Sequence, residues 1–206
     1  MKIYLVRHGA DEEGYRGGWS QRGLVKEGIV ESQKLGEYLQ ANPNEYSINT
    51  IISSDLPRAV QTTQELELKL GLSSIANKEW REMNNGVLAG MPHAQAEVHY
   101  AGVYFNTLHM DSEFPGGESP RHFYDRINQS FRELCRRIED QELASNVLLV
   151  THGGVINMLY YVLSGQEWTN QSSFYPIDHT SIHTVTKANE GWKMSEMNIR
   201  NHLNET

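Results

Sequence analysis

Short runs of apolar and β-branched residues alternate along this chain with longer segments whose apolar residues recur at helical spacing. The short runs are typical of buried strands. Strands are predicted over Lys2–Val6, Ile48–Ser53, Ile75–Trp80, Asn146–Thr151, Ser181–Thr186 and Trp192–Asn198. Strands that alternate with helices form mostly parallel sheets covered on both faces. We therefore expect an α/β fold, a three-layer sandwich with a central, mostly parallel sheet.

The intervening segments predict helices over Leu24–Leu39 and Gly153–Leu163. Another helix is expected over Pro57–Gly71, with Asp55 as its N-terminal cap. The clearest helix begins at Ser119-Pro120, because its apolar residues fall on one face with polar residues opposite. That face carries Phe123, Ile127, Phe131, Leu134 and Ile138.

The chain has 206 residues and is expected to form a single domain over 1–206. Residues 82–115 are predicted to be irregular and are rich in Gly, His, Met and aromatic residues. A cap insertion over a pocket is expected at about 84–115, and a small packed cluster of these side chains is the alternative. The oligomeric state is left open, and a homo-oligomer is compatible with the sequence.

Composition excludes several classes of protein. The single cysteine, Cys135, excludes an intramolecular disulfide framework and cysteine-rich zinc sites. The net charge is −8 and no stripe of Lys and Arg occurs, so no nucleic-acid partner is expected. The longest apolar runs are too short to span a bilayer, and the first residues do not resemble a signal peptide. We therefore expect a soluble cytoplasmic protein with no membrane partner.

Basic side chains and histidines follow the predicted strands. Arg7 and His8 follow the first strand, Arg58 lies shortly after the second, and His152 follows Asn146–Thr151. The carboxyl ends of strands in open α/β sheets are where sites form. An arginine binds phosphate oxygens with two N–H groups, and a neutral imidazole is a nucleophile near pH 7. A helix that begins at Gly153 would also direct free N–H groups at an anion.

These residues lie in motifs that resemble those of the histidine phosphatase superfamily, the phosphoglycerate mutase-like proteins. The matching motifs are LVRHG (5–9), SSDLPRAVQT (53–62), RE followed by NNG (81–86), PGGES (115–119) and VTHGGVI (150–156). They occur in the family's order along nearly the whole chain. The resemblance therefore rests on several motifs rather than on RHG alone.

The resemblance implies a role for five residues. His8 matches the nucleophile that becomes phosphohistidine, and Arg7 and Arg58 match the residues that clamp the phosphate. His152 matches the second histidine at the phosphoryl group. Glu82 matches the acid that protonates the leaving oxygen.

The chain departs from the family's pattern at several positions. RHGET is common in the family's first loop, whereas Ala10 and Asp11 follow RHG here, and Gly14 replaces an asparagine. Asp11 adds a negative charge near the pocket. Leu24-Val25 replaces the usual Leu-Thr, which removes a threonine cap from the next helix.

No metal and no organic cofactor are expected. His93, His99 and His109 have no spacing typical of metal ligands. His122 is predicted to lie on the surface, and Cys135 to be a small helix residue rather than a nucleophile. Asp178-His179 is predicted to lie at the rim of the pocket.

The function expected from these residues is metal-independent hydrolysis of phosphomonoesters, of the histidine acid phosphatase type. The reaction would pass through a phosphohistidine, and the substrate would be a small phosphorylated metabolite. Phosphoglycerate mutase-type phosphoryl transfer, an isomerase reaction, is an alternative. The segment from Gly86 to Pro115 is about 30 residues, shorter than in most mutases of the family. A non-catalytic binding protein on the same scaffold is the third possibility.

Overall fold

The computed structural model describes residues 1–204 and contains one six-stranded sheet. The strands lie in the order β3-β2-β4-β1-β5-β6. They are β1 (Lys2–Arg7), β2 (Thr50–Ser53), β3 (Ser74–Ala76), β4 (Asn146–Thr151), β5 (Ile182–Ala188) and β6 (Gly191–Ile199). The first four are mutually parallel. At one side of the sheet, β5 pairs antiparallel with β1, and β6 pairs antiparallel with β5. The predicted mostly parallel sheet is confirmed.

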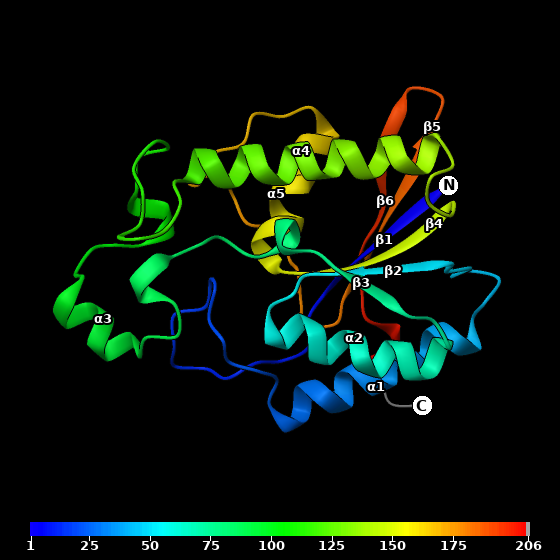
Figure 1. Cartoon of the computed structure of the whole chain (residues 1–206), viewed down its shortest axis with the longest axis horizontal. Coiled ribbons are helices and arrows are strands. Elements are labelled where there is room, and N and C mark those ends of the chain that lie inside the picture. Colours follow the sequence, from blue (N-terminus) through cyan, green and yellow to red (C-terminus); the bar gives the residue numbers. More distant parts are fainter. Residues whose placement is uncertain (205–206) are drawn as a thin grey trace.

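Helices cover both faces of the sheet. They are α1 (Lys26–Ala41), α2 (Pro57–Leu70), α3 (His93–His99), α4 (Pro120–Glu139) and α5 (Gly153–Ser164). Figure 1 shows α4 and α5 over one face and α1 and α2 over the other. The three-layer α/β sandwich expected from the sequence is therefore confirmed.

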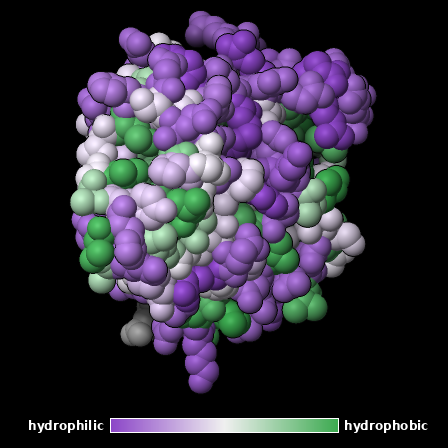
Figure 2. Space-filling view, turned by 60° about the vertical axis from the view of Figure 1, so that its left-hand side comes forward, coloured by the Kyte–Doolittle hydropathy of each residue, from purple (hydrophilic) through white to green (hydrophobic). Residues whose placement is uncertain are grey.

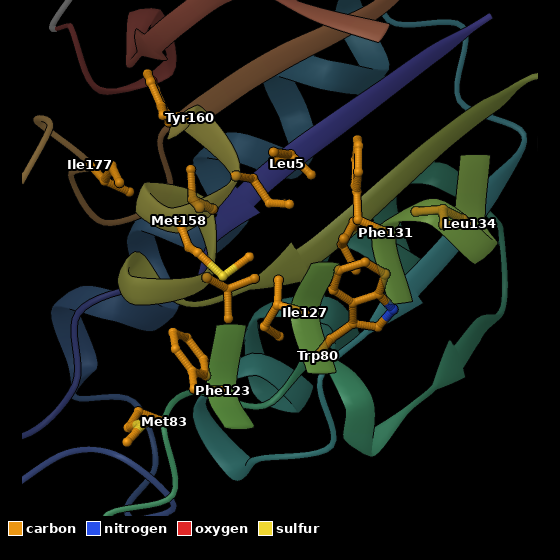
Figure 3. Packing of buried hydrophobic residues seen from close by; sticks show 14 of the residues in the cluster. Leu5, Trp80, Met83, Phe123, Ile127, Phe131, Leu134, Met158, Tyr160 and Ile177 are labelled. Atoms are coloured by element: carbon orange, nitrogen blue, oxygen red, sulfur yellow. The ribbon is translucent and has the colours of Figure 1, made fainter. Parts of the chain in front are cut away.

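Each face of the sheet has its own apolar core. Ile3 and Leu5 of β1 pack with α4 and α5, whereas Tyr4 and Val6 pack with α1 and α2. This alternation follows from the two-residue period of a strand. Figure 3 shows the larger core, in which Phe123 and Ile127 of α4 meet residues of α5 and the sheet. The predicted apolar face of α4 is buried, as expected.

Two local predictions are wrong. The strand predicted over Ile75–Trp80 is shorter, because β3 ends at Ala76 and a 3-10 turn follows over Lys78–Trp80. The Asn77 side chain accepts a hydrogen bond from the Glu79 N–H and so stabilises this turn. Asp55 does not cap α2; its carboxylate binds the Arg81 guanidinium through two hydrogen bonds of 2.5 and 2.6 Å instead.

Other helix starts agree with the sequence. The Ser119 hydroxyl accepts a hydrogen bond from the His122 N–H and caps α4. Val25 precedes α1 without a side-chain cap, as the replacement of threonine implies.

Within residues 1–204, none of the helices is long and apolar enough to cross a membrane.

Segment 84–115 lies at the end of the molecule to which the parallel strands point (Figure 1). It is less irregular than predicted, because it contains α3 and two 3-10 turns. The backbone of Tyr15 pairs with Pro92, so this segment is joined to the loop that follows β1. These two segments form the walls of the site described next.

Candidate active site

The parallel strands β1, β2 and β4 are neighbours, so the residues that follow them meet at one edge of the sheet. His8 follows β1 and His152 follows β4, and their ring centroids are 5.1 Å apart. Arg58 reaches the same point from the first turn of α2. The structure thus brings together the two histidines and the arginines that the sequence singles out.

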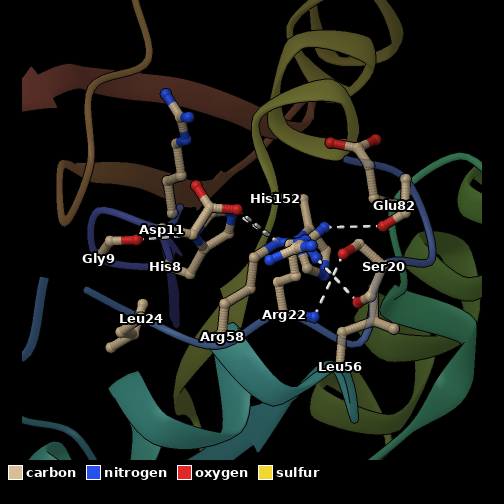
Figure 4. A network of polar contacts seen from close by, with 12 residues as sticks. His8, Gly9, Asp11, Ser20, Arg22, Leu24, Leu56, Arg58, Glu82 and His152 are labelled. Carbon is tan, nitrogen blue, oxygen red and sulfur yellow. Dashed lines mark hydrogen bonds and ion pairs between the residues drawn. The ribbon is translucent and has the colours of Figure 1, made fainter. Parts of the chain in front are cut away.

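The protonation of His8 follows from its contacts. Its Nδ1 lies 2.8 Å from the Gly9 carbonyl oxygen, so Nδ1 donates and carries the proton. Its Nε2 accepts a hydrogen bond of 3.1 Å from Arg58 Nε, as drawn in Figure 4. Burial, Arg58 and Arg7 hold the pKa of His8 well below its usual range. His8 is therefore neutral, with the Nε2 lone pair directed into the site.

Both guanidinium groups are held in place by the backbone. Arg58 donates to the Gly18 carbonyl oxygen at 2.8 Å, and its side chain is almost fully buried. Arg7 donates to the Ile177 carbonyl oxygen at 2.7 Å. Fixed guanidinium groups on two sides of His8 form a preorganised anion site.

His152 is fully buried and is fixed through a hydroxyl. Its Nε2 lies 2.8 Å from Ser54 Oγ. Its Nδ1 has no hydrogen-bond partner within the described part of the chain. Burial, Arg58, His8 and Arg7 hold the pKa of His152 well below its usual range, so this ring is also neutral.

The side chain of Glu82 reaches the N-terminal end of α5. Its carboxylate accepts hydrogen bonds from the N–H of Gly154 at 2.9 Å and of Met83 at 3.0 Å. A Cβ on Gly154 would overlap the Glu82 carboxylate, so this approach requires glycine. The Glu82 carbonyl also accepts from Trp19 Nε1 at 2.7 Å. The carboxylate is thereby fixed beside Gly153, the first residue of α5.

Two further groups lie in the site. Asp11 Oδ2 is 3.7 Å from Arg58 Nε, and burial raises the pKa of this carboxyl. His179 Nε2 accepts a hydrogen bond of 2.7 Å from Arg7, and burial lowers its pKa to about 4. His179 thus lies inside the site, whereas Asp178, named with it from the sequence, bonds Asn198 and Arg200.

A cavity of about 790 Å³ opens above these groups. Segment 84–115 lines one side of it through Leu88, His93, Val103, Phe105 and Phe114. The long loop between β1 and α1 lines the other side, and Phe174 also contributes. Sequence reasoning missed the wall formed by Tyr15–Arg22 and by Phe174. The length of the first loop was the available signal, because long ordered loops are often functional.

The histidines of segment 84–115 do not assemble into a metal site. Among residues 1–204, the grouping compatible with a metal ion consists of His8, Asp11 and His179, whose ligand atoms lie within 4.8 Å of one another. Arg7 donates to His179 and Arg58 donates to His8. Two guanidinium groups at these nitrogens oppose a cation and favour an anion.

The arrangement suits a phosphoryl group, and comparison with known proteins agrees. The sequence model of the histidine phosphatase superfamily (branch 1) matches residues 3–200. The chain therefore belongs to this superfamily, as its motifs indicate. Phosphoglycerate mutase-like protein 4 of Arabidopsis thaliana is 32% identical over 166 residues, which make up 77% of this chain and 69% of that protein.

Two solved structures share the fold. The alpha-ribazole phosphatase of Shigella flexneri superposes with a TM-score of 0.80 at 22% identity, over 97% of each chain. A mycobacterial glucosyl-3-phosphoglycerate phosphatase superposes with a TM-score of 0.77 at 23% identity. That match covers 96% of this chain and 98% of the other.

Proposed function

We propose that this protein hydrolyses phosphomonoesters of small metabolites through a phosphohistidine on His8. The observation that carries the proposal is the neutral His8 ring, whose unprotonated Nε2 accepts from Arg58 while Nδ1–H is bound to the Gly9 carbonyl. The membership of a phosphatase superfamily supports it as well. The attack forms a bond between Nε2 and phosphorus, and the bond from phosphorus to the leaving oxygen breaks. The Gly9 carbonyl then stabilises the positive charge of the phosphorylated ring.

In this mechanism the basic groups hold the phosphoryl oxygens. Arg7 and Arg58 bind them through guanidinium N–H groups. His152 donates its Nδ1–H, and the start of α5 contributes the positive end of the helix dipole. These contacts strengthen as charge builds on the oxygens in the transition state.

Glu82 has the role of acid and then of base. Its carboxyl group donates a proton to the departing alcohol oxygen. The carboxylate formed in this way then takes a proton from the water that attacks the phosphohistidine. Hydrolysis restores the neutral His8 and releases inorganic phosphate, so the protons balance over one cycle.

The proposed chemistry uses no metal ion, because the guanidinium groups supply the positive charge. The contacts of Arg7 and Arg58 with the nitrogens of His179 and His8 support this part of the proposal. Exhaustive EDTA treatment should leave the rate unchanged. A rate that is lost on chelation and restored by Mg²⁺ would exclude the metal-free mechanism.

The covalent intermediate can be trapped directly. A phosphohistidine is stable in base and labile in acid, so an alkaline quench during turnover of a ³²P-labelled substrate should leave label on His8. The variant His8→Ala should lose both label and turnover, whereas His122→Ala, at an exposed histidine, should keep both.

Two other results would change the assignment. Label on His152 would make that residue the nucleophile. Interconversion of 2- and 3-phosphoglycerate at a rate above that of hydrolysis would favour the mutase, which the name of the Arabidopsis relative suggests for that protein.

A further inference from the structure

The charges around the cavity are unevenly distributed. Beyond Arg7 and Arg58, two more arginines are among its lining residues, and both are already paired. Arg16 binds Glu97 at 3.0 Å and stacks over the Tyr104 ring. Arg22 binds Glu12 and lies over the Tyr15 ring. Each guanidinium already has one terminal nitrogen bound to a carboxylate, so a second anionic group would have to share it with that carboxylate.

Acidic side chains surround the same space. Asp11, Glu12 and Glu13 follow one another along the loop after β1, and all three line the cavity. Glu13 contributes to the raised pKa of Asp11, so the negative charge of Glu13 acts on a group beside Arg58. His93 lies at the exposed mouth, where water competes for its ring nitrogens. Glu12 is paired with Arg22, so a carboxylate or second phosphate on a substrate would meet repulsion from Asp11 and Glu13.

The facing wall is apolar. Met83, Leu88, Val103, Phe105, Phe114 and Phe174 line it. Phe174 is 62% exposed, and its Cζ lies 3.5 Å from the point that a Cβ on Gly153 would occupy. This ring therefore lies over the start of α5, beside the phosphate site. Figure 2, which turns this end of the molecule forward, shows hydrophobic residues in separate patches among hydrophilic ones rather than in one broad band.

We propose that the alcohol part of the substrate carries an aromatic or other apolar group and no second anion. The proposal rests on the phosphatase function above and names the substrate class of that site. The apolar group packs against Phe105 and Phe174, and the acidic loop excludes phosphoglycerates, bisphosphates and nucleotides. The cavity can select its substrate through charge repulsion and apolar contact, without a hydrogen bond to the alcohol part of the ester.

Three primary alkyl phosphates with similar leaving groups test this selectivity. They are benzyl phosphate, glycerol 3-phosphate and 3-phosphoglycerate. We expect kcat/KM for benzyl phosphate to exceed that for glycerol 3-phosphate by roughly tenfold, which is about the effect of burying one ring face. We expect 3-phosphoglycerate to be a further tenfold poorer or worse, on the order of one screened charge repulsion.

Two variants identify the walls responsible. Phe174→Ala should lower the benzyl-to-glycerol preference about fivefold, since it removes much of the exposed ring contact. The matched control Leu68→Ala, at an exposed residue of α2, should leave the preference unchanged.

The double variant Glu12→Gln/Glu13→Gln frees Arg22 and should raise kcat/KM for 3-phosphoglycerate relative to that for glycerol 3-phosphate. Its control is Glu190→Gln in the exposed turn between β5 and β6.

Failure of this inference differs from failure of the proposed function. Equal or better kcat/KM for 3-phosphoglycerate, with phosphohistidine still trapped, would overturn the substrate class alone. A benzyl preference that survives Phe174→Ala unchanged would also overturn it. The absence of turnover and of label with all three esters would overturn the phosphatase assignment, and the substrate class with it.

Discussion

A single hydroxyl group sets the orientation of the second histidine. Ser54 Oγ accepts a long hydrogen bond of 3.4 Å from the Leu56 N–H, so its own proton is free to go to His152 Nε2. Nε2 then accepts, and the proton of the neutral ring must reside on Nδ1. Nδ1 is the atom without a partner in the described part of the chain. Ser54 therefore positions an N–H donor for the phosphoryl group without touching it.

Replacing this hydroxyl tests the positioning role. Ser54→Ala should lower kcat roughly ten- to hundredfold, the effect of losing about 1–3 kcal/mol of oriented hydrogen bonding, and change KM less. Ser54→Thr should recover part of the rate, because it retains the hydroxyl. Ser53→Ala removes a neighbouring buried hydroxyl that donates to the Ser54 carbonyl and accepts from Thr63, with no bond to His152, and it should keep kcat near that of the unchanged protein. Equal losses in the Ser53 and Ser54 variants would assign Ser54 a purely structural role.

The first turn of α5 contains a glycine, Gly154, whose lack of a side chain determines where Glu82 lies. Gly154 presents its N–H to Glu82, and the missing Cβ leaves room for the carboxylate. Alanine has a higher helix propensity than glycine, so Gly154→Ala should not destabilise α5 itself. The substitution should instead displace Glu82 from the helix start.

The displaced carboxylate should matter most when the leaving group is poor. Gly154→Ala should therefore reduce kcat/KM for benzyl phosphate at least about tenfold more than for p-nitrophenyl phosphate, whose phenolate leaves without a proton. Ser164→Ala at the other end of α5 is the control. An equal effect on both esters would show that Gly154 serves packing rather than the placement of the acid.

Elements with strong periodicity were predictable from the sequence, and elements fixed by distant contacts were not. α4 follows from five apolar residues on one face, and β4 from an unbroken apolar run. The strand predicted to Trp80 ends early because Asn77 stabilises a turn through a local side-chain bond. Asp55 fails as a cap because Arg81, far along the chain, takes its carboxylate.

The same distinction holds for the site. His8, Arg58 and His152 were predictable, since topology alone brings strand ends together. The placement of Asp11 and Phe174 depends on the packing of loops, which has no sequence period. The sequence predicted the charge of Asp11 near the pocket, but its contact with Arg58 and the part played by Phe174 were seen only in three dimensions.

Across the whole molecule, several histidines are buried in the neutral form. Burial lowers the pKa of His179, His183 and His202 to about 4, and holds those of His8 and His152 well below 6.5. The unfolded chain binds protons at these residues near pH 6.5, whereas the folded chain does not. The free energy of unfolding is therefore greatest above about pH 6.5 and falls as the pH drops toward 4. Asp11, with its raised pKa, acts in the opposite direction, but as one group.

This linkage predicts a measurable loss of thermal stability in mild acid. The Tm at pH 5.0 should lie more than about 5 °C below that at pH 7.5, because several groups titrate in this window. His183→Gln should reduce the difference between the two pH values, whereas His122→Gln, at an exposed histidine, should preserve it. A Tm that is the same at both pH values would contradict the prediction.

The carboxylate of Asp11 beside Arg58 has a consequence for the end of the catalytic cycle. Because it is tethered next to the guanidinium, Asp11 acts as an internal competitor at high effective concentration. Orthophosphate bound at the arginines would compete with this carboxylate for Arg58. A lower affinity for the released phosphate is therefore the consequence that we expect of this contact.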